Sequence, residues 1–316
     1  MNKTSKFLFL GLTLLILFIS VGNISATDNT DTTTTMSDNI EQDIHNDMAD
    51  EKSVVKTTVT TKKVNSENKN ITKKTIKTDK QPIKKSVHLI GTANDYKSLK
   101  TSWDDAQSSN DTTLYTINVK NGRYNFEEEL TSNNISTAKT IIFNGESKDK
   151  TIFDGQGKTR FFNLNNTNQV IQFNNITFIN GFNNSEGGAI LANSTLKLNN
   201  TVFINNKVSG GNLSSMGGAL VSYHDLSVYD SYFINNSADS ICNYTYGGAI
   251  VTDNNTLIYN CSFINNSVTD IEGKLAYSGI GGAFYSNSKH NATINIFLCE
   301  FINNSANATV KNTQKT

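Results

Sequence analysis

The sequence predicts an all-β protein, a right-handed parallel β-helix with a short capping helix at its N-terminal end. Gly-Gly-Ala followed by an apolar residue occurs four times, at 187–190, 217–220, 247–250 and 281–284. Phe-Ile-Asn-Asn follows each copy, with its Phe sixteen residues after the first Gly in three copies and twenty in the last. A repeat of about 30 residues indicates a solenoid, in which each unit buries its apolar face by stacking on its neighbour.

The charge balance of the chain argues against one class of function, nucleic-acid binding. The chain has 28 basic and 28 acidic side chains, so its formal net charge is zero. Nucleic-acid binding by counterion release needs a basic face, and this balance argues against such a partner. No spacing of residues predicts a catalytic, metal or cofactor site.

Residues 1–26 predict a signal peptide. Lys3 and Lys6 precede the apolar run 7–19, and Ser25-Ala26 provides the small residues of a cleavage site. The run is shorter than the roughly 20 residues that span a bilayer. We expect cleavage near Ala26 and export to the cell surface or medium; a buried N-terminal helix of a cytosolic domain is the alternative.

Residues 27–86 predict a disordered stalk rich in Thr and Lys. Eight acids and no Lys or Arg occur in 27–51, and eleven lysines occur in 52–85. So polar a segment buries too little apolar surface to offset its chain entropy. The lysine block could instead adhere to an anionic cell wall or headgroup layer.

Residues 87–160 predict an N-terminal cap and the first coils. Tyr96, Leu99, Trp103 and Ala106 have helical spacing after Asn94-Asp95, which offers an N-cap. A helix here would cover the open end of the solenoid. Extended segments are expected at 114–119, 140–143 and 151–153.

Residues 161–316 predict the β-helix repeats, in register on Phe178 and the four motif Phe residues. The structural positions of the repeat are Gly187, Gly188, Phe203, Gly217, Gly218, Phe233, Gly247, Gly248, Phe263, Gly281, Gly282 and Phe301. The Phe rings should stack inside, and the residues seven and five positions upstream should face inward with them. Bends are expected three residues before each Phe, at Asn175, Asn200, Asp230 and Asn260, whereas Leu298 departs from this pattern. The Asn-Asn pairs predict a second corner with amide ladders between coils.

The cysteines allow two interpretations. Cys261 and Cys299 stand two residues before a motif Phe, in a column with Ile176, Thr201 and Ser231 that should face inward. A bridge between adjacent coils is conceivable at a strand spacing of about 4.8 Å. Reduced thiols are favoured, because no spacing among these residues and Cys242 suggests a redox pair.

The segment between each Phe and the next Gly-Gly varies in length, so loops should protrude from one flank. The candidate binding loops are 207–216, 238–246 and 268–280, and they contain Tyr244, Tyr246 and Tyr277. These rings suit sugars or protein surfaces. They could equally fold back on the solenoid.

The paired motifs Gly-Gly-Ala-Ile and Phe-x-x-Asn resemble those of the chlamydial polymorphic outer-membrane proteins. The Asn-rich form Phe-Ile-Asn-Asn-Ser is similar to the adhesin-like surface proteins of methanogenic archaea, over about residues 86–309. The resemblance implies a parallel β-helix displayed at the cell surface and used for attachment to a cell-surface glycan or protein. Phe178-Ile179-Asn180-Gly181 lacks the final Asn. Retention through an uncleaved N-terminus, the lysine block or a partner, or outright secretion, all stay open, as does the oligomeric state.

Asn-x-Ser/Thr triplets predict glycosylation, favouring the stalk and loops, because Asn235 and Asn265 are expected to be held in corner ladders.

A structural envelope protein without specific ligand is the alternative to adhesion. A polysaccharide lyase or hydrolase would need clustered carboxylates, whereas Asp154 suits a turn and His224-Asp225 are neighbours that point to opposite faces of a strand.

Overall fold

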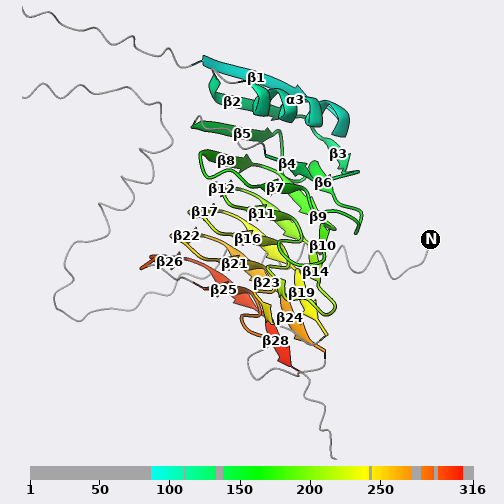
Figure 1. The fold of residues 1–316 in the computed structure, drawn as a ribbon, viewed down its shortest axis with the longest axis vertical. Coiled ribbons are helices and arrows are strands. Elements are labelled where there is room, and N and C mark those ends of the chain that lie inside the picture. The colour runs from blue at the N-terminus through cyan, green and yellow to red at the C-terminus, as the bar shows by residue number, and fades with distance from the viewer. Residues whose placement is uncertain are drawn as a thin grey trace, which may run out of the picture. The chain divides into compact units, whose positions relative to one another are not determined.

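The computed structural model describes residues 87–109, 112–132, 138–241, 244–271, 279–287 and 291–308. The predicted signal peptide and stalk lie outside the described residues, as do Tyr277 and Cys242. Five sheets of parallel strands stack along the described coils, and the chain passes from one sheet to the next in each coil (Figure 1). This confirms the predicted parallel β-helix.

Three of the sheets contain the repeat motifs and the residues upstream of each motif Phe. Sheet A contains β1 Val87–Ala93, β2 Thr112–Val119, β5 Lys139–Gly145, β8 Gln169–Asn174, β12 Thr195–Asn199, β17 Leu226–Tyr229, β22 Thr256–Tyr259 and β26 Ile294–Phe297. Sheet B contains β3 Gly122–Asn125, β6 Thr151–Asp154, β9 Thr177–Ile179, β13 Val202–Ile204, β18 Tyr232–Ile234, β23 Ser262–Ile264 and β27 Glu300–Ile302. Sheet C contains β4 Leu130–Thr131, β7 Phe162–Leu164, β11 Ile190–Ala192, β16 Leu220–Ser222, β21 Ile250–Thr252 and β25 Phe284–Ser286.

The variable flank is more ordered than expected. Its segments begin as sheet D, made of β10 Phe182–Asn183, β14 Lys207–Ser209, β19 Ser237–Ser240, β24 Ser267–Asp270 and β28 Ser305–Ala308. Two of them end in sheet E, made of β15 Ser215–Met216 and β20 Thr245–Tyr246. The prediction that 207–216, 238–246 and 268–280 are loops throughout is therefore wrong. Val208, Ala238 and Val268 face inward and are fully buried, which makes the first residues of each segment part of the solenoid wall.

The N-terminal helix α3 (Tyr96–Ser108) confirms the predicted cap. Asp95 is its N-cap, and its carboxylate accepts a hydrogen bond from the Ser98 backbone at 2.8 Å. Trp103 is buried and stacks on Phe143 at 5.9 Å between ring centroids. Lys139 Nζ donates to the Ala106 carbonyl, in the last turn of the helix, at 2.5 Å. A cation is stabilising at a helix C-terminus, and burial lowers the pKa of this lysine. Figure 1 shows α3 beside β1 and β2 at the start of the solenoid.

The motif Phe residues form a single stack through the interior. Phe178, Phe203, Phe233 and Phe263 are fully buried, and consecutive rings lie 4.7 to 5.0 Å apart and almost parallel. Phe301 continues the stack at 4.8 Å and is 48% exposed, because it lies in the last described coil. Burying one such ring contributes about 1.5–3 kcal/mol before entropy is subtracted.

Left-handed residues form the two corners that flank sheet B. Between sheets A and B, the residues with positive φ are Asn175, Asn200, Asp230, Asn260 and Leu298, at 50° to 55°. Between sheets B and D they are Asn180, Asn205, Asn235, Asn265 and Asn303, at 52° to 56°. Asn and Asp tolerate this conformation best among residues with a side chain, so the predicted bends are confirmed. Leu298 adopts the same φ of 51° without that preference, with its side chain 71% exposed.

The second Asn of each Phe-Ile-Asn-Asn builds the predicted amide ladder. Asn206, Asn236 and Asn266 are fully buried. Asn206 donates to Asn236 Oδ1 from its backbone N at 3.0 Å and from Nδ2 at 2.9 Å. Asn236 donates in the same way to Asn266, and Asn266 to Asn304. Each amide thus satisfies backbone groups that the corner leaves unpaired.

The paired glycines meet two separate backbone demands. The first Gly of each pair is left-handed, as at Gly217, where φ is 63°. The second packs against the next coil: a Cβ on Gly218 would lie 2.2 Å from the Gly248 carbonyl oxygen. No side chain fits at that distance, so the coils could not stack with any other residue there.

The cysteine column faces inward, as expected. Thr201 and Ser231 are fully buried, and Cys261 is 2% exposed. Cys261 and Cys299 are both free thiols, which agrees with the favoured interpretation for this pair. Burial raises the pKa of Cys261 to about 12, so its thiol is a poor nucleophile at neutral pH.

Candidate functional site

The predicted aromatic residues form part of a tyrosine row on the variable flank. Tyr244 stacks on Tyr246 at 5.9 Å between ring centroids, and Tyr246 stacks on Tyr285 at 4.6 Å. Tyr244 is 41% exposed, whereas Tyr246 is half-buried. Burial raises the pKa of Tyr246, and the neighbouring tyrosines add to the effect. The two interpretations of these rings are therefore combined, because the row folds against the solenoid and still presents one ring to solvent.

Sequence reasoning missed Tyr285 for a clear reason. It follows Phe284 in β25, on the outer face of sheet C, in a column with Val221 and Val251. A strand position next to an inward-facing motif residue carries no distinguishing signal. Tyr285 joins the row through the stacking of its ring on Tyr246.

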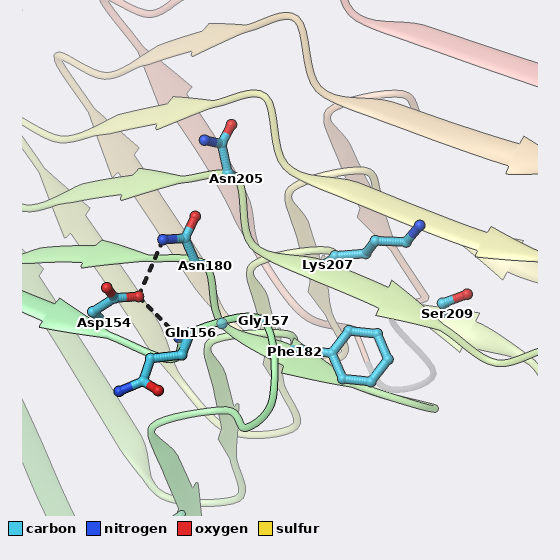
Figure 2. Close-up of a pocket in the computed structure, with 9 residues that line it drawn as sticks. Asp154, Gln156, Gly157, Asn180, Phe182, Asn205, Lys207 and Ser209 are labelled. Atoms are coloured by element: carbon cyan, nitrogen blue, oxygen red, sulfur yellow. Dashed lines mark hydrogen bonds between the residues drawn. The ribbon is translucent and has the colours of Figure 1, made fainter. Parts of the chain in front are cut away.

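A hollow of about 660 Å³ opens where sheets B and D meet (Figure 2). Its lining combines one aromatic ring with amide, hydroxyl and charged groups. The lining residues are Asp154, Gln156, Gly157, Asn180, Gly181, Phe182, Asn205, Lys207 and Ser209. Lys207 and Ser209 lie in the predicted binding segment 207–216, whereas the other lining residues were not predicted to bind, since the hollow is formed by three coils and no single repeat contains it.

The charges of the hollow are balanced by internal pairs. Lys207 Nζ lies 3.0 Å from Asp239 Oδ1, and Ser209 Oγ donates to the same carboxylate at 2.7 Å. Asp154 accepts hydrogen bonds from Arg123 Nε at 2.8 Å and from Asn180 Nδ2 at 3.1 Å. The hollow therefore offers amide donors and acceptors in a nearly neutral surround.

Asp154 is held as a carboxylate. Burial opposes its ionisation, but hydrogen bonds from the Gln156 backbone, Asn180 and Arg123 outweigh burial and lower its pKa. The Gln156 bond, 2.9 Å to Asp154 Oδ1, closes the expected turn. A carboxyl group with a lowered pKa is a poor general acid, which a glycosidase requires.

His224 and Asp225 take separate partners. His224 Nδ1 lies 3.2 Å from Thr195 Oγ1, and Asp225 accepts from Asn255 Nδ2 at 3.2 Å. Each contact links adjacent coils, so the geometry of both residues suits the fold. Among the described residues, no group of three or more His, Cys, Asp or Glu side chains could hold a metal ion.

The corner asparagines require a correction. Asn235 and Asn265, the first residues of their Asn-x-Ser triplets, are exposed at the left-handed corner. The ladder is made by Asn236 and Asn266 instead. The expectation that ladder bonds shield Asn235 and Asn265 from glycosylation is therefore wrong, because the two functions of the Asn-Asn pair are divided between its members.

Comparisons with known proteins give no relative from which a site could be transferred. No family profile, no curated protein and no solved structure matches the chain. Within the described ranges, no helix has the length and apolar character needed to cross a membrane.

Proposed function

We propose that this protein is an exported cell-surface protein that attaches to glycans through the variable flank of its β-helix. The observation that carries the proposal is the hollow, which the Phe182 ring lines on the side of Lys207 and Ser209 and the amides of Asn180 and Asn205 line on the other side (Figure 2). Amides donate to and accept from sugar hydroxyls, and an aromatic face packs against the apolar face of a sugar ring. The tyrosine row provides a second aromatic surface on the same flank.

Two features favour binding without catalysis. Asp154 is engaged by three partners and has a lowered pKa, and the second carboxylate at the hollow, Asp239, is paired with Lys207. With its lowered pKa, Asp154 lacks the proton that a general acid must donate at neutral pH. Glycan capture requires only complementary hydrogen bonds and stacking, which the lining supplies.

The test is a glycan-array screen of the full chain, followed by binding measurements on three variants. Phe182→Ala and Tyr244→Ala each remove one partly exposed ring from the flank, and we expect at least a tenfold loss of affinity from one or both. Tyr232→Ala is the matched control, because Tyr232 is 40% exposed but lies on the outer face of sheet B.

The competing function is a structural envelope protein without specific ligand. It is favoured by the fact that the motif Gly, Phe and Asn residues are all accounted for by the fold. This function predicts no hit on the array and equal behaviour of the three variants. Deleting 268–280 would not separate the two functions, because Val268 and Asp270 belong to a strand of sheet D and the deletion would remove part of the wall.

A further inference from the structure

The base of the variable segments encloses a small polar interior. Four fully buried side chains form this loop base, and they lie where sheets D and E meet: Ser215, Ser240, Thr245 and Asp270. Ser215 Oγ donates to the Asp239 carbonyl at 2.6 Å, and the Ser240 and Thr245 hydroxyls lie 2.6 Å apart. The rest of the interior is mainly apolar, so this oxygen-rich column needs a reason of its own.

Asp270 is the charged member of the loop base. It is fully buried, and neither carboxylate oxygen has a hydrogen-bond partner among the residues that the structure describes. It is the register partner of Ser240, and β20, which carries Thr245, packs beside its strand. An unpartnered carboxylate away from water is strongly unfavourable. Such a group in a native protein indicates a bound ion or water.

The described residues of the neighbouring coil that lie beside Asp270 do not supply a counter-charge. Asp270 is the register partner of Ala308, and a Cβ on Gly279 would lie 3.7 Å from the Ala308 Cβ. Glycine and alanine offer no side-chain polar group. The oxygen donors on the adjacent strands are the Ser240 and Thr245 hydroxyls, and hard cations prefer oxygen ligands.

We propose that Asp270 binds a calcium ion at the loop base, with the Thr245 and Ser240 hydroxyls as neighbouring oxygen donors. With a single carboxylate, the dissociation constant should lie at about 10⁻⁴–10⁻³ M, the weak end of the calcium range. Because Tyr246 follows Thr245 directly in β20, the ion would fix the tyrosine row to the wall. The proposal is independent of glycan binding.

Terbium luminescence tests the site, since Tb³⁺ replaces Ca²⁺ and emits when a nearby tyrosine is excited. The chelator-treated full chain should give saturable emission that Ca²⁺ displaces. Asp270→Asn, which keeps the side-chain shape, should reduce emission at least tenfold at equal Tb³⁺. Asp253→Asn is the control, because Asp253 lies in the turn after sheet C, and its emission should match that of the wild type.

Thermal unfolding of the wild type provides a measurement that does not depend on the variant folding. Millimolar Ca²⁺ should raise the unfolding midpoint. A midpoint that does not change with millimolar Ca²⁺ would overturn the proposal. Undiminished terbium emission from a folded Asp270→Asn chain would overturn it as well. Loss of glycan binding with intact terbium emission would count only against the proposed function.

Discussion

The Asn ladder predicts that two adjacent asparagines differ sharply in their contribution to stability. Asn236 Oδ1 accepts from Asn206 N and Nδ2, and its Nδ2 donates to the Phe203 carbonyl at 3.1 Å and to Asn266 Oδ1 at 3.0 Å. Asn236→Ala removes these four bonds inside the protein. At about 1 kcal/mol for each bond, the cost is about 4 kcal/mol, and buried groups left unpaired would add to it.

Asn235→Ala is the matched control. Asn235 is exposed and left-handed, with φ of 54°, and no ladder bond involves its side chain. Alanine loses only the asparagine's tolerance of that conformation, which costs about 1 kcal/mol. Asn235→Gly should be neutral or slightly stabilising, because glycine adopts positive φ freely.

Urea denaturation of the full chain, followed by far-UV circular dichroism, measures both changes. We expect the midpoint for Asn236→Ala to fall several times further than that for Asn235→Ala, with similar slopes. Equal losses at the two positions would refute the assignment of the ladder to the second Asn. A larger loss at Asn235 would place the ladder on the wrong member of the pair.

Three more predictions follow from burial and charge. Phe263→Ala should cost about 3–5 kcal/mol because the ring is fully buried, and Phe301→Ala clearly less because its ring is 48% exposed; denaturant midpoints check both. In native protein at pH 8, iodoacetamide should label Cys299 well before Cys261, because burial raises the pKa of the Cys261 thiol to about 12. Peptide mass spectrometry measures labelling at the two sites. Equal labelling would contradict the inward orientation of the cysteine column. The pKa of Asp154 is lowered, so its contribution to stability is complete above its unfolded value of about 3.8 and is lost as the pH falls through the lower folded value. Asp154→Asn should therefore lose stability at pH 7 and show a shallower decline below pH 4 in thermal scans.

The fold could be predicted because residues with the same structural roles recur in the same order in each coil. Phe203 and its equivalents face inward, Asn200 and its equivalents bend the chain, and Gly218 permits contact between backbones. The assignment within Asn235-Asn236 could not be made from the sequence, because two identical residues give no sign of which is left-handed and which is buried. Strict alternation from the inward-facing Phe233 would turn Asn235 inward, but the left-handed turn at Asn235 breaks the alternation and buries Asn236 instead.

The candidate site was predicted only in part. Tyr244 and Tyr246 were found because they stand in a segment of variable length. Sheet D was not, because Val208 and its equivalents are small or β-branched residues separated from the motifs by only one polar position. The hollow around Phe182 depends on three coils meeting at a corner, and such a juxtaposition exists only once the register between coils is known.

The repeat also indicates where function should be sought. Fold demands recur in every coil, so a residue that the fold requires has equivalents of the same kind above and below it. Phe182 stands in a column with Lys207 and Ser237, and Asp270 stands between Ser240 and Ala308. Neither an aromatic ring nor a carboxylate is needed at these positions to build a coil, because the neighbouring coils are built without them. Phe182 and Asp270 both interrupt their columns without serving the fold, and we therefore propose that they serve binding. Both residues belong to sheet D, so the hollow and the loop base lie on the variable flank.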